Sequence, residues 1–149
     1  MATPHDAELI LKLYELRREE VMRKARAFMI SEFFPESFDD IKALWTDREH
    51  PERSAYFRQV VTFWDMAAAL VNHGSLDAGL FFDANSEHLG VWTKIAPFVG
   101  QLREVFGAAY LKSLETLVQH QPDAEKRIAI FKERFKQLAA MRAAQTQKA

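Results

Sequence analysis

The chain has 149 residues, a length that suits one domain with its own hydrophobic core, and 48% of its residues are apolar. It contains no cysteine, which excludes disulfides, thiolate metal sites and a cysteine nucleophile. Its net charge of −1 provides no general attraction to phosphate backbones, so the composition does not favour a nucleic-acid partner and leaves only a local basic patch as a basis for one. The N-terminus lacks a secretory signal, and no apolar run approaches the roughly 18 residues of a membrane span. We therefore expect a soluble cytoplasmic protein without an integral membrane segment.

Apolar residues recur at helical spacing throughout the chain, and strand patterns are scarce. The first helix is predicted from about His5 to Met29, with Thr3 as its N-cap and Pro4 in its first turn. A short second helix is predicted after Ser37, which is followed three positions later by an acidic residue, as in a capping box.

The third predicted helix, from about Pro51 to His73, is apolar over one continuous half of its surface and ends at Gly74. This pattern is typical of the central helix of a bundle. Trp64 lies within the apolar half, and Asp65 lies just beyond it. A short fourth helix is predicted over residues 76–84.

The fifth predicted helix covers residues 86–106, with a kink at Pro97. Its apolar arc contains Trp92 and is interrupted by two polar residues, His88 and Arg103. A sixth helix follows near Leu111. The sequence thus predicts an all-α fold, a single-domain bundle of about six or seven helices over residues 1–149, with two long central helices at about 51–73 and 86–106.

The seventh predicted helix begins at Pro122, and residues 143–149 at its end are expected to fray. From Lys126 onward the chain carries seven Lys or Arg residues and one acidic residue, next to an apolar stripe. One interpretation is a core-packed helix with a solvated outer face. The alternative is that the basic helix 126–142 binds an acidic partner protein, a membrane surface or a nucleic acid.

Arg103 is the most informative residue in the sequence, because a guanidinium on an apolar face needs a carboxylate or carbonyl partner. We predict that it is mostly buried and paired with Asp65, with Asp83 or Glu87 as the next candidates. It would then serve as a structural ion pair. A snorkelling side chain or a ligand-binding arginine are the alternatives. In the ligand-binding case, Arg103, Asp65 and His88 would lie beside Trp64 and Trp92 and bind a small anionic or aromatic ligand. The plainer interpretation of His88 is a hydrogen-bonded core residue.

Three groups of residues together resemble a family of uncharacterised bacterial all-helical proteins. They are Phe63-Trp64-Asp65-Met66-Ala67, Asn72-His73-Gly74-Ser75-Leu76-Asp77, and Trp92 with Pro97 and Arg103. The resemblance covers about residues 56–106. It implies a helical fold and supports a pairing of Asp65 with Arg103, and it implies no particular chemistry.

Searches for catalytic patterns lead to no candidate. The five histidines lack metal-site spacing, and the sequence has neither a glycine-rich phosphate loop nor a nucleophile elbow. We therefore assign no catalytic residue, no metal and no cofactor. The sequence favours a non-enzymatic interaction or regulatory module that self-associates as a homo-oligomer or binds another protein. The alternative is a ligand-binding protein, or an enzyme, built on the Arg103 site.

Overall fold

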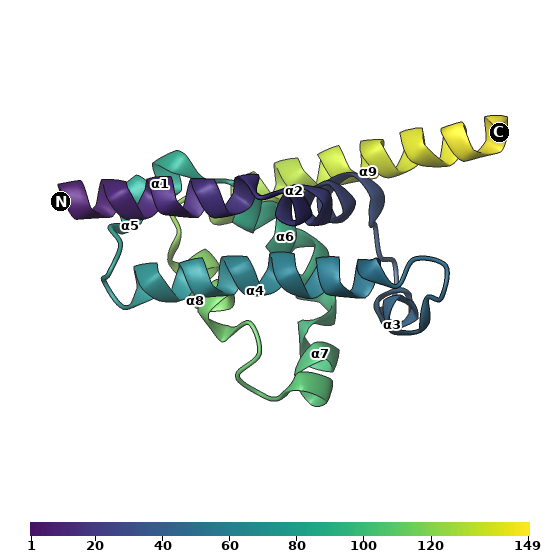
Figure 1. Ribbon diagram of the computed structural model, residues 1–149, viewed down its shortest axis with the longest axis horizontal. Helices are drawn as coiled ribbons and strands as arrows, with labels where there is room; N and C mark the ends of the chain where they lie inside the picture. Colours follow the sequence, from purple (N-terminus) through teal and green to yellow (C-terminus); the bar gives the residue numbers. More distant parts are fainter.

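Residues 1–149 are all described in a computed structural model, and they form helices joined by short loops without any strand, which confirms the predicted all-α class. Figure 1 shows α4 (Glu52–Asn72) crossing the middle of the molecule, with the other helices arranged around it. None of the helices combines the length and the hydropathy of a membrane-spanning segment.

The N-terminal helix is divided in two, α1 (Pro4–Arg18) and α2 (Glu20–Ala27), and a π-helical turn, η1 (Phe28–Glu32), continues α2. The predicted cap at Thr3 is confirmed, since its side chain accepts from the Asp6 N–H. The prediction of one continuous helix is wrong at Glu19. There the backbone adopts a ψ of 143°, and the Glu19 carboxylate caps the next helix by accepting from the N–H groups of Val21 and Met22.

The middle of the chain follows the predicted order, with one interruption. α3 (Phe38–Thr46) is capped by Ser37 as predicted, and α5 (Ala78–Ala84) is capped by Asp77. The long helix predicted over 86–106 is divided at Pro97 into α6 (Glu87–Ile95), a 3₁₀ turn η2 (Ala96–Phe98) and α7 (Val99–Phe106). Proline cannot donate the helical hydrogen bond at this position, so the break coincides with it.

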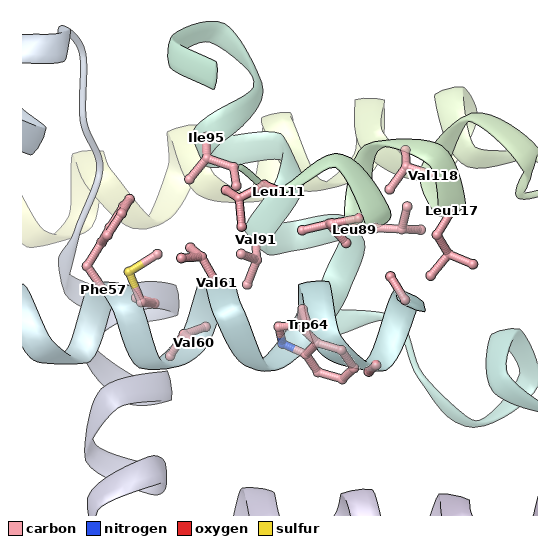
Figure 2. Packing of buried hydrophobic residues seen from close by; sticks show 14 of the residues in the cluster. Phe57, Val60, Val61, Trp64, Leu89, Val91, Ile95, Leu111, Leu117 and Val118 are labelled. Atoms are coloured by element: carbon pink, nitrogen blue, oxygen red, sulfur yellow. The ribbon is translucent and has the colours of Figure 1, made fainter. Parts of the chain in front are cut away.

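The hydrophobic core lies where α4 meets α6 and α8 (Lys112–His120). Figure 2 shows side chains of α4 meeting those of the other two helices. Trp64, Val61 and Leu89 are fully buried there. The apolar half predicted for the helix at 51–73 is therefore the part of α4 that forms the core.

The last helix, α9 (Ala124–Lys148), packs mainly on α6. Gly90 of α6 makes this close approach possible, because a Cβ atom there would lie 3.0 Å from the Phe131 ring and 3.3 Å from the Phe135 ring. Figure 1 shows the final turns of α9 projecting past the other helices to the C-terminus. The helix is continuous through the residues that the sequence predicts to fray, and every residue from Ala140 onward is exposed.

Candidate functional site

A groove of about 690 Å³ runs along α9, between this helix and the segment where α6 passes into η2. Residues 34–36 close its other side. Its lining is mainly aromatic, proline and alanine side chains, with three lysines, one threonine and one glutamate. The residues are Phe34, Pro35, Glu36, Thr93, Lys94, Pro97, Phe98, Lys132, Phe135, Lys136, Ala139, Ala140 and Ala143.

Lys94 lies at the floor of this groove and is only 7% exposed. Its ammonium donates hydrogen bonds to three backbone carbonyls, those of Met29, Ile30 (3.1 Å) and Phe33 (2.7 Å). These carbonyls belong to the end of η1, where the last C=O groups of a helix have no partner within the helix. Lys94 therefore caps the C-terminal end of the α2–η1 helix from a different part of the chain, at the negative end of its dipole.

Two aromatic rings enclose the same ammonium. The Lys94 Nζ atom lies 4.0 Å from the centre of the Phe34 ring and 4.4 Å from that of Phe135. Burial lowers the pKa of Lys94 to about 7. The carbonyl oxygens and the ring faces oppose that shift because both stabilise the charged form.

The polar groups at the floor of the groove are used in holding the fold together. All three N–H donors of the Lys94 ammonium have carbonyl acceptors, and the Thr93 hydroxyl donates to the Leu89 carbonyl at 2.7 Å. Lys132 and Lys136, one helical turn apart on α9, are exposed at the rim. The groove therefore combines a mainly apolar lining, whose buried polar groups already have partners, with a cationic edge, an arrangement suited to binding by shape and charge.

The predicted ion pair between Arg103 and Asp65 is wrong. Arg103 is mostly buried against a carboxylate, but that carboxylate belongs to Glu115 of α8, and the Arg103 Nε donates to the Tyr110 carbonyl at 2.9 Å. Burial would raise the pKa of Glu115, but hydrogen bonds from Arg103 and Lys112 lower it below its ordinary value.

Asp65 is occupied elsewhere. Its Oδ1 accepts from the Leu114 N–H at 2.8 Å, in the first turn of α8. Leu111, the residue before α8, has no side chain that can cap a helix, so the carboxylate from α4 satisfies this free N–H. Glu87, another candidate partner for Arg103, instead binds Arg26 with both oxygens, at distances between 2.7 and 3.0 Å.

His88 is the hydrogen-bonded core residue that the plainer interpretation predicts. It is fully buried, and its Nε2 donates to the Gln121 Oε1 at 2.7 Å. Burial lowers the pKa of His88 to about 4. Trp64 is buried too and donates to Glu87 at 3.3 Å, while Trp92 is half-buried against the core.

The five residues predicted to bind a ligand are thus all engaged within the fold. Four of them bond to other residues of the chain, Trp92 packs against the core, and none of the five lines the α9 groove.

Sequence reasoning missed Lys94, although the sequence around it contained a signal. Gly90, Val91 and Phe98 lie three or four positions from it, so the lysine is on a helical face with small and apolar neighbours. The carbonyls that hold it are more than 60 residues away, and no side-chain pattern indicates free carbonyls.

The segment 72–77, one of the three groups of residues that carry the family resemblance, forms a junction between helices. Gly74 ends α4 with a φ of 72°, a conformation that glycine adopts readily. Three residues later, the Asp77 N–H donates to the Asp6 carboxylate of α1 at 2.7 Å, and the Asp77 side chain caps α5 by accepting from the Leu80 N–H. The turn therefore joins α1, α4 and α5.

The family model described as a domain of unknown function, DUF4760, matches residues 2–121. The chain has no significant match among curated proteins or among solved structures. The matched part includes α1 to α8 and ends at Gln121, the residue bonded to His88, whereas α9 follows it. The match covers most of the chain, so this protein belongs to the DUF4760 family, whose domain has no assigned function.

Proposed function

We propose that this protein is an interaction module that binds a partner protein through the groove beside α9. The observation that carries the proposal is the groove itself, which has a mainly apolar lining and two exposed lysines at one edge. Surfaces of this kind bury apolar area at their centre and keep charge at the rim, as protein interfaces do.

The proposal is supported by the role of the buried lysine. The Lys94 ammonium holds three carbonyls and two ring faces, so it fixes the shape of the groove floor. A floor that is held in place from below loses little freedom when a partner binds, which favours binding.

A different protein suits the groove better than a second copy of this chain. α9 carries seven basic and two acidic residues, so two copies packed through α9 would bring like charges together. Self-association, which the sequence led us to expect, would have to overcome this repulsion.

A small anionic ligand is a second candidate for the same groove. Its volume of about 690 Å³ falls within the range of roughly 300–1,000 Å³ that small-molecule sites occupy. Lys132 and Lys136 would supply the positive charge that the sequence suggested for Arg103. A thermal-shift screen with anionic metabolites tests this candidate, because a ligand that binds only the folded state raises the melting temperature.

Site-specific photo-crosslinking in the cells that produce the protein tests the main proposal. A photoreactive amino acid would replace either Ala143, which lines the groove, or Met141, which is exposed on the opposite face of α9. We expect a discrete crosslinked protein from position 143 and none from position 141. The product should disappear when Ala139→Arg fills the groove.

Equal crosslinking from both positions would show that the groove is not the contact surface. A product made of two copies of this chain would replace the proposed partner with self-association. The absence of any protein product at position 143 would contradict the proposal.

A further inference from the structure

We infer that the occupant of the groove is an acidic amphipathic helix of the partner protein, laid alongside α9 with its carboxylates against Lys132 and Lys136. This inference rests on the proposed function and specifies the chemistry of the partner.

The shape of the groove fits a helix. Ala139, Ala140 and Ala143 present small side chains on one face of α9, so a second helix can approach closely there, at roughly 8–10 Å between axes. Phe34 and Phe98 lie at the other side and offer apolar surface to the larger side chains of such a helix. Figure 1 shows the last turns of α9 extending past the other helices, and the residues of these turns are exposed, so this part of α9 is free to meet a second helix.

The charged residues of the groove indicate the sign of the charge that the partner helix should carry. Lys132 and Lys136 lie one turn apart, and neither forms an ion pair within the chain. Glu36 is the one acidic side chain in the lining. Two carboxylates one turn apart on an incoming helix would match the two ammonium groups.

A membrane surface fits this site less well than a helix does. Phe131 and Phe135 of α9 already pack on α6 and on each other. The two large apolar residues of α9 that are exposed, Ile130 and Met141, lie about three helical turns apart, so they form no continuous apolar face for a bilayer. The apolar surface of the groove itself is concave, and a flat bilayer would contact only its rim. A helix can enter the groove and reach its floor.

A displayed library of amphipathic helices provides a defined probe. Its members would share leucine and alanine on one face, and their polar positions would vary among Glu, Gln and Lys. Selection on the full-length protein should enrich Glu at two positions one turn apart. Enrichment of Lys, of neutral residues, or of no sequence would overturn the inference.

The selected peptides would then be measured against two charge-reversed variants. Lys132→Glu/Lys136→Glu changes the groove rim, whereas Arg134→Glu/Arg142→Glu makes the same change in charge at two positions of α9 that do not line the groove. All four side chains are exposed, so both variants should fold, which circular dichroism verifies. We expect about a tenfold loss of affinity for the first variant and little change for the second, at low salt. An equal loss in both would overturn the inference.

Two further results separate this inference from the proposed function. Binding to anionic phosphatidylserine vesicles that is weakened equally in both variants would identify α9 as a general basic surface and overturn the inference. Failure of peptide binding with continued crosslinking at position 143 would remove the acidic helix but leave the interaction module. Loss of both peptide binding and crosslinking at position 143 would overturn the acidic-helix inference and the proposed function together.

Discussion

Lys94 and Arg103 are two largely buried cations that lie nine positions apart on the α6–η2–α7 segment, and the fold accommodates them in different ways. Arg103, whose side chain is 17% exposed, forms an ion pair with a carboxylate of α8. Lys94, at 7% exposure, has no carboxylate partner and is held by three carbonyls and two aromatic rings. One charge is balanced by an opposite charge, and the other by the dipoles at the end of a helix.

The side chains match these environments. A guanidinium is planar and presents a fork of donors that suits a carboxylate, whereas an ammonium presents three donors around one atom, which suits three carbonyls that converge on a point. The comparison shows that a buried cation does not by itself indicate a nearby acid. At the C-terminal end of η1, the unpaired carbonyls of the backbone perform that role.

The largest expected effect concerns Lys94. Lys94→Met should lower the free energy of unfolding by about 3–5 kcal/mol, because three carbonyls lose their donor while the side-chain volume is kept. Lys94→Arg should not restore stability, since a planar guanidinium cannot reach all three carbonyls. Urea denaturation of the three proteins measures both effects. A methionine variant as stable as the parent would show that the three hydrogen bonds from Lys94 to backbone carbonyls make no net contribution to the free energy of unfolding.

His88 extends the comparison to a basic side chain that burial keeps neutral. The unfolded chain takes up a proton near pH 6.5, whereas the folded chain does so near the lowered pKa of about 4. Between these values the unfolded state binds more protons, so stability should decrease as the pH falls from about 6.5 to 4, by about 3 kcal/mol in total.

Urea denaturation at successive pH values checks this effect of His88. His88→Gln removes the titrating group, and its stability should vary less across the same window. Carboxyl groups titrate in both proteins, so the difference between the two profiles isolates the histidine. Parallel profiles would mean that His88 is not the source of the pH dependence.

The smallest effect is expected at Arg103. Arg103→Ala should cost about 1–2 kcal/mol, because Glu115 is partly exposed and keeps Lys112 at 3.2 Å. A double-mutant cycle of Arg103→Ala with Glu115→Ala should give a coupling energy near 1 kcal/mol. The corresponding cycle with Asp65→Ala should give less than about 0.5 kcal/mol. A larger coupling energy with Asp65 than with Glu115 would instead support the pairing of Arg103 with Asp65 that the sequence suggested.

Much of the fold was predictable because helix boundaries and core faces are local properties. Thr3 and Ser37 cap helices where their spacing indicates, Gly74 ends α4, and the apolar half of α4 forms the core. The division at Glu19 was missed, because its carboxylate caps a helix from an ordinary interior position, without a proline or glycine to mark it.

The candidate site depended on contacts that sequence periodicity does not specify. The spacing of apolar residues indicated that Arg103 and His88 face inward, and both do. The spacing did not indicate that Arg103 would pair with Glu115 rather than with Asp65. The Asp65 carboxylate instead accepts a hydrogen bond from the uncapped first turn of α8, a contact between helices that the spacing within one helix does not specify.

By itself, the sequence determined the helical class, most helix boundaries and the buried face of each central helix, because hydrophobic period and capping residues act within a few positions. The tertiary structure alone decided which group each buried cation meets, and it brought α9 against residues 34–36 and η2 to form the groove. The partners of Lys94 are backbone carbonyls at least 61 positions away, and every residue has such a carbonyl, so no residue type could mark them in advance.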